Sequence, residues 1–92
     1  MKLMVELDGQ ILPLAQCFWI HVAPNGCVCG SSHGDQALTA DDAHKVFRAR
    51  QRDRDREIRD GWAMRLVTRE QWDQQAKPCL MGECEHRKEV AA

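Results

Sequence analysis

The sequence predicts a single α+β domain spanning residues 1–92, with a small antiparallel sheet of three to four strands, one long charged helix and a short C-terminal helix. The chain has 92 residues, which is the length of one domain. Its aromatic and β-branched residues gather in short runs that end at Asp-Gly or Asn-Gly turns, the pattern of antiparallel strands. A stretch rich in Arg and Asp follows a threonine cap and ends at Gly61, which predicts the long helix.

The first half of the chain supplies most of the sheet. Residues 2–7 alternate weakly before the Asp8-Gly9 turn and are expected to form a strand. Residues 11–14 contain Pro13, which favours an edge strand or a connection. Residues 17–22 form the strongest strand pattern in the chain, and the Asn25-Gly26 turn should return it as a partner strand over 27–29.

A two-residue turn at Asn25-Gly26 fixes the expected register of this hairpin. Val22 would then lie opposite Cys29, and Ala23 would lie opposite Val28. Alternation along the strands puts Cys27 and Cys29 on one face, together with Phe18, Ile20 and Val22. The opposite face would carry Cys17, Trp19 and His21. The polar residues 30–35 are expected to form a loop.

Helices and one further strand fill the second half. Thr39 can cap a helix whose first turn carries Asp41 and Asp42, and this helix should run through a charged middle to Gly61. Residues 62–67 alternate as a strand. Thr68 and Gln71 form a capping box, which begins a short helix that stops before Pro78.

Composition limits the classes of function. The net charge of −1 gives no general attraction to nucleic acid or to an anionic membrane. The chain has no apolar run near the roughly 18 residues that a membrane span needs. Acidic residues within the first apolar stretch argue against a signal peptide. We therefore expect a cytoplasmic, reducing location, where clustered cysteines indicate metal binding or catalysis more than disulfides.

Four of the five cysteines fall into two close groups, and each group has a histidine nearby. The candidate ligands are Cys27, Cys29, His33, Cys79, Cys84 and His86. Zinc takes four thiolate or imidazole ligands, and Gly82 permits the turn that would direct Cys79 and Cys84 inward. A structural zinc would pin the C-terminal tail, residues 77–92, to the sheet. Buried thiols without a metal, or a disulfide between the two groups, remain alternatives.

Cys17 and His21 form a candidate nucleophile and base pair along one strand, and His44 is a candidate base from elsewhere in the chain. Four residues apart on a strand, Cys17 and His21 would lie roughly 13 Å from one another, too far for a hydrogen bond. The sequence contains no Ser/His/Asp set, paired carboxylates, phosphate loop or dinucleotide fingerprint. We therefore predict a protein that is not an enzyme, and a thiol-based redox protein is the weaker alternative.

The charged helix supplies a candidate contact surface. Arg48, Arg52, Arg56 and Arg59 could share one stripe, and Trp72 could serve as an interface anchor beside it. This pattern favours a protein-binding module. A solvated helix face with no partner is the alternative, and so is a zinc-stabilised nucleic-acid-binding protein. The acids between the arginines weaken attraction to phosphate.

Two segments resemble small accessory proteins encoded by bacteriophages of high-GC hosts. These segments are Leu38-Thr39-Ala40-Asp41-Asp42-Ala43 through Leu66-Val67-Thr68-Arg69-Glu70-Gln71-Trp72, and Pro78-Cys79 through Cys84-Glu85-His86. The resemblance lies in length, style and segment order, and it assigns no role to any residue. It implies a compact, non-enzymatic protein in the cytoplasm of a host cell, which binds a host protein and redirects host machinery or inhibits host defence.

Overall fold

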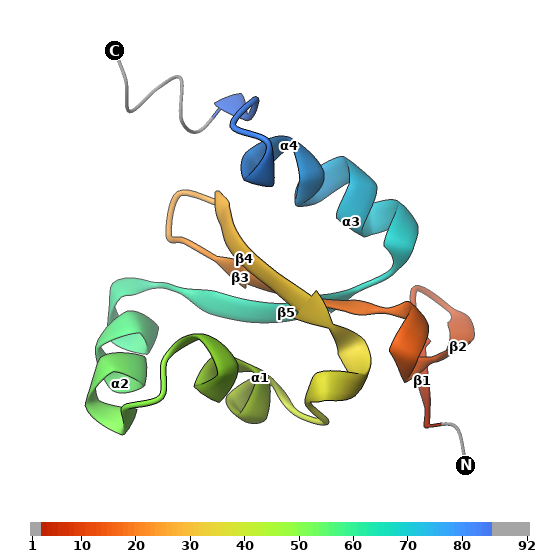
Figure 1. Ribbon diagram of the computed structural model, residues 1–92, viewed down its shortest axis with the longest axis horizontal. Coiled ribbons are helices and arrows are strands. Elements are labelled where there is room, and N and C mark those ends of the chain that lie inside the picture. Colours follow the sequence, from red (N-terminus) through yellow and green to blue (C-terminus); the bar gives the residue numbers. More distant parts are fainter. Residues whose placement is uncertain (1–2, 86–92) are drawn as a thin grey trace.

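The computed structural model describes residues 3–85, which form an α+β fold of three layers. A central sheet has two helices on each face (Figure 1). The strands are β1 (Met4–Leu7), β2 (Gln10–Pro13), β3 (Phe18–Val22), β4 (Val28–His33) and β5 (Ala63–Val67). The helices are α1 (Ala40–Phe47), α2 (Gln51–Asp60), α3 (Arg69–Gln75) and α4 (Lys77–Leu80), with 3-10 turns η1 (Leu14–Gln16) and η2 (Gly34–Gln36).

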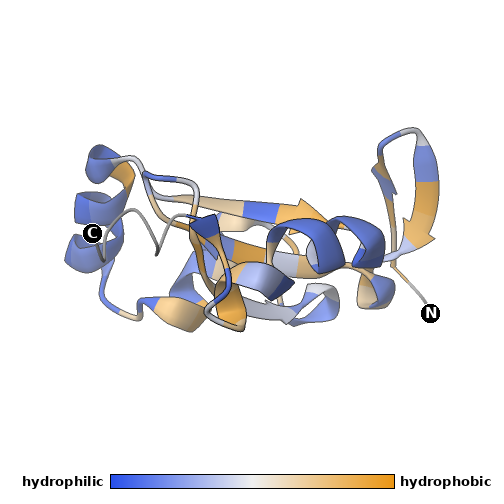
Figure 2. Ribbon diagram, turned by 90° about the horizontal axis from the view of Figure 1, so that it is seen from above, coloured by the Kyte–Doolittle hydropathy of each residue, from blue (hydrophilic) through white to orange (hydrophobic). Residues whose placement is uncertain are grey.

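The described strands divide into two antiparallel sheets, where the sequence predicts one sheet of three to four strands. The central sheet has the order β4-β3-β5, and β1 pairs only with β2. The β1–β2 hairpin turns at Asp8 and Gly9, which both adopt positive φ. Leu14 donates a backbone hydrogen bond to Leu3, so the chain crosses directly from this hairpin into η1. The hairpin stands at the end of the molecule opposite to α2 (Figure 2).

The β3–β4 hairpin forms as predicted, but its register differs. Ala23 and Cys27 close a three-residue loop in which Gly26 takes a φ of 91°. A β-bulge follows, because Val22 pairs with Val28 while His21 pairs with Gly30. Cys29 is the extra residue of this bulge. It faces outward, and the predicted shared face of Cys27 and Cys29 is therefore wrong. Strand β4 continues to His33 through residues that were expected to form a loop.

The predicted long charged helix is two helices. Thr39 caps α1 as expected, and Gly61 ends α2 with a φ of 99°. Between them Arg48 is extended, and the Arg54 guanidinium donates to the carbonyl oxygens of Arg48 and Ala49. This segment lacks an apolar stripe that could hold one continuous helix against the sheet. The break folds α2 back beside α1, which is what brings Glu57 to the sheet.

Each face of the sheet packs against its own helices. Ile20, Val28 and Val67 lie under α3 and α4, in one buried cluster that also includes Cys27, Cys79 and Cys84. Trp19 fills the opposite face beneath α1, with Met64 and Leu66 of β5 beside it. The Trp19 indole nitrogen donates to the carbonyl oxygens of Gly34 and Ala37, at 3.2 and 3.0 Å. The shared face of Met64 and Leu66 follows the predicted alternation.

The predicted short helix forms as α3, which ends before Pro78, and a further helix, α4, follows it. The predicted capping box is present, because Thr68 accepts from the Gln71 backbone and the Gln71 side chain accepts from the Thr68 backbone. Pro78 lies in the first turn of α4, which the sequence did not predict. This second helix places Cys79 against the sheet.

Candidate metal centre

Three cysteine side chains converge on the face of the sheet beneath α4. Cys27 follows the β3–β4 turn, where its backbone nitrogen donates to the Asn25 side chain. Cys79 lies in α4, and Cys84 follows the turn at Gly82, whose φ is 79°. All three side chains are buried, and their sulfur atoms lie within 4.8 Å of one another. The fold thus joins residues from the first third of the chain to its C-terminal segment.

The spacing of these sulfur atoms suits a tetrahedral metal ion. The Sγ atoms of Cys27 and Cys84 are 3.7 Å apart. Two thiolates bound to one zinc ion at about 2.3 Å would be separated by about 3.8 Å. Burial, followed by contact with the thiols of Cys84 and Cys27, raises the pKa of Cys79 to about 11. A divalent ion would reverse this preference, because it stabilises the thiolate directly.

The remaining predicted ligands lie elsewhere or outside the described residues. Cys29 is exposed on the bulge, and its Sγ points to the backbone oxygen of Cys27 at 3.8 Å. His33 lies at the far end of β4, where its ring packs 5.5 Å from that of Phe18. The structure brings neither residue into the cysteine cluster. His86 lies outside the described residues, and so does the rest of the predicted 77–92 tail beyond Glu85.

A hollow of about 530 Å³ adjoins the cysteine cluster. Cys79 and Cys84 line it together with Arg65 of β5, Gln74, Gln75 and Glu85. The cluster therefore lies at the edge of the core, where an ion could enter between α4 and the β3–β4 turn.

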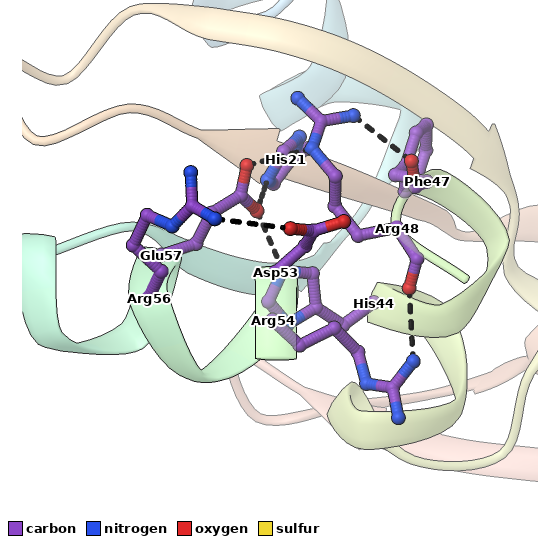
Figure 3. A network of polar contacts seen from close by, with 8 residues as sticks. All are labelled: His21, His44, Phe47, Arg48, Asp53, Arg54, Arg56 and Glu57. Atoms are coloured by element: carbon purple, nitrogen blue, oxygen red, sulfur yellow. Dashed lines mark hydrogen bonds and ion pairs between the residues drawn. The ribbon is translucent and has the colours of Figure 1, made fainter. Parts of the chain in front are cut away.

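A second cluster of ligand-type side chains lies on the opposite face of the sheet and was not predicted. His21 Nε2 and His44 Nε2 both contact the same oxygen of Glu57, Oε1, at 2.9 and 2.7 Å (Figure 3). Arg48 Nε donates to the other oxygen, Oε2, at 2.8 Å. One signal could have revealed this cluster: His21 falls in the most apolar strand of the chain, and a buried imidazole requires a polar partner.

Burial and hydrogen bonding set the charges in this second cluster. Burial lowers the pKa of His21 and so favours its neutral form, although contact with Glu57 opposes that shift. Burial alone would raise the pKa of Glu57. Hydrogen bonds from His44, His21 and Arg48 outweigh that effect and hold the pKa below its ordinary value. Glu57 is therefore a carboxylate at neutral pH, and its partners donate to it.

Cys17 and His21 do not form a catalytic pair. The Cys17 thiol is buried and lies 3.7 Å from the carbonyl oxygen of Pro13. Burial raises its pKa, which reduces the fraction of nucleophilic thiolate. The imidazole of His21 is directed at Glu57 instead.

The predicted contact residues separate into three environments. Arg48 and Arg56 are paired with Glu57 and Asp53, whereas Arg52 and Arg59 line an exposed hollow of about 430 Å³. Trp72 lies against the opposite face of the sheet from α2. Its indole nitrogen donates to Ser31 Oγ at 2.8 Å, and its ring packs 5.4 Å from Phe18. The arginines and Trp72 therefore do not share one surface.

No protein-family model matches the sequence, and no curated protein or solved structure is significantly similar to it. Among the helices of residues 3–85, none is both long enough and apolar enough to span a membrane.

Proposed function

We propose that this chain is a small zinc-binding domain that acts as a non-enzymatic binding module. The convergence of the Cys27, Cys79 and Cys84 sulfur atoms in one buried cluster supports the zinc site. Thiolates are preferred zinc ligands, and closed sites with three or four of them are structural. The zinc ion would fasten α4 and the residues after it to the β3–β4 turn.

The role of the ion follows from the small size of the domain. A chain of 92 residues buries a modest core, so a metal tie contributes a large share of its stability. The ion would close the structure between residues that are far apart in sequence, where loop closure costs most entropy. His86 is two residues beyond Cys84 and is our proposed fourth ligand.

Single substitutions test this site against a matched control. We expect Cys79→Ser and Cys84→Ser to abolish stoichiometric zinc binding in native mass spectrometry and to lower the melting temperature. Cys29→Ser should leave both unchanged, because Cys29 is exposed and outside the cluster. His86→Ala should weaken zinc binding, whereas His33→Ala should not. If the purified protein binds no zinc, or if Cys29→Ser loses it as readily as Cys79→Ser, the site is not the one proposed.

We further propose that α2 is the contact surface for a protein partner, which would be a protein of the host cell if the chain is of phage type. Ile58 is 58% exposed, and it lines the hollow that Arg52 and Arg59 also line. An apolar centre beside arginines is typical of the core of a protein interface. The surface of the partner that contacts α2 is therefore proposed to be apolar at its centre and acidic at its edge.

A photo-crosslinking amino acid at position 58 tests this surface directly. We expect it to capture one defined protein from the host, and the purified partner should bind the wild type but not Ile58→Asp or Arg52→Glu. Position 81 is the control, because Met81 is 65% exposed and follows α4 on the other side of the sheet. Equal capture from both positions would contradict the proposal. Binding to nucleic acid that falls steeply with salt would favour the nucleic-acid alternative.

A further inference from the structure

We propose that His21, His44 and Glu57 form a second metal site, which takes a divalent transition ion through two imidazole nitrogens and one carboxylate oxygen. The three side chains come from β3, α1 and α2, and their ligand atoms lie within 4.8 Å of one another. This site is independent of the cysteine cluster, since it lies on the other face of the sheet.

The geometry of the cluster is close to that of a bound ion. Both imidazoles direct Nε2 at the same carboxylate oxygen, so ligand atoms from three elements lie close together. An ion would replace the protons that the two Nε2 atoms donate to Glu57, because an imidazole nitrogen binds metal only without its proton. The 2.9 and 2.7 Å contacts to Glu57 compare with separations of about 3.0–3.4 Å for donors around one ion at about 2.1 Å. An ion would therefore lengthen each of these two contacts by a few tenths of an ångström.

The surroundings hold these donors in place. The His21 ring stacks on Phe47 with centroids 5.4 Å apart and packs against Trp62 at 4.6 Å. Arg48 binds the Glu57 oxygen that faces away from the imidazoles, which leaves Oε1 directed at the site. Bonds of this kind, to the far side of a ligand, orient carboxylates in metal sites. Two nitrogens and one oxygen suit iron(II), cobalt, nickel and zinc, and the donor set is harder than three thiolates.

An ion could reach this site through the gap between the two helices. A hollow of about 270 Å³ lies there, with His44 in its wall. Asp41 and Asp55 line it with negative charge, and Lys45 and Arg54 line it with positive charge. The mixed lining is polar, so a hydrated ion can enter it, and the two carboxylates offset part of the charge that the ion adds next to Arg48.

Cobalt(II) is the probe that separates the two proposed sites. Cobalt is titrated into zinc-loaded protein while the absorption spectrum and the imidazole nitrogen NMR signals are recorded. We expect one further equivalent to bind without a sulfur-to-cobalt charge-transfer band, and the His21 and His44 signals to broaden selectively. Cobalt that enters the cysteine cluster would instead produce the charge-transfer band, so failure of one site is distinguishable from failure of the other.

Substitutions assign the ligands. Glu57→Gln keeps the size of the side chain and should weaken this second binding event by about 100-fold, whereas Arg48→Met should weaken it by about 10-fold. His33→Gln is the matched control and should leave it unchanged. If Glu57→Gln fails to fold, the NMR measurement on the wild type still tests whether His21 and His44 bind cobalt. Absence of a second equivalent, or cobalt binding that leaves the His21 and His44 signals sharp, would show that the cluster is a hydrogen-bonded network only.

Discussion

Oxidation of the metal-free protein should join Cys27 to Cys84. Their sulfur atoms are 3.7 Å apart, and only a modest movement separates this contact from a covalent bond. In this experiment a chelator removes the metal, and glutathione disulfide is then added as the oxidant. Two thiols of the protein would lose two protons and two electrons to form one disulfide, and one glutathione disulfide would be reduced to two glutathione molecules.

The expected gain in stability follows from the length of the loop that the bond closes. Cys27 and Cys84 are 57 positions apart. Loop-closure entropy for that length stabilises the folded state by about 4 kcal/mol relative to the reduced protein. With a urea dependence of about 1–3 kcal/mol per molar, the unfolding midpoint should rise by at least about 1 M.

Peptide mapping by mass spectrometry and urea unfolding measure these two outcomes. Cys29→Ser serves as the background, so that the exposed thiol cannot exchange into the bond. Zinc-loaded protein should resist the oxidant, because its thiolates are bound. The reasoning is refuted if the dominant disulfide joins other cysteines, or if the bridged protein unfolds at the same urea concentration as the reduced one.

Three further results are expected. Gly34→Ala should cost more than about 2 kcal/mol of unfolding free energy in urea titrations, because its Cβ would lie 2.2 Å from the backbone oxygen of Leu14. Gly30→Ala is its control and should cost less, since its Cβ meets the Phe47 side chain and not backbone. Thr68→Ala should cost about 1 kcal/mol by the same measurement, through loss of the capping box. Zinc should bind more tightly at pH 8 than at pH 6 in chelator competition, because Cys79, with a pKa of about 11, must lose its proton to bind; equal affinities would count against its role as a ligand.

The local elements of this fold could be predicted because local chemistry specifies them. Strands over 17–22 and 62–67 follow from dense apolar alternation, and they appear as β3 and β5. The caps at Thr39 and Thr68 and the helix end at Gly61 follow from side-chain and glycine chemistry within one turn.

Features that depend on contacts distant in sequence could not be predicted. Hydrogen bonds from Arg54 and to Glu57 hold the break at Arg48. Nothing in the charge pattern shows that these bonds stabilise the chain more than a continuous helix would. The bulge at Cys29 turns its thiol to the opposite face of the strand. The spacing of the cysteines therefore predicted Cys29 as a ligand, although it is exposed to solvent. The His21, His44 and Glu57 cluster joins three elements, and only the folded chain places them together.

The position of the cysteine cluster has a consequence for synthesis of the protein. Cys27 leaves the ribosome long before Cys79 and Cys84, and α3 and α4 are made after all the strands of the central sheet. Until they arrive, the sheet face that carries Ile20 and Val28 has no cover, although its strands are complete. A chain that stops before α3 therefore presents an apolar face to chaperones and proteases, and only a chain that includes α3 and α4 can hide it. In this way the residues that follow β5 determine whether the cell retains the folded sheet.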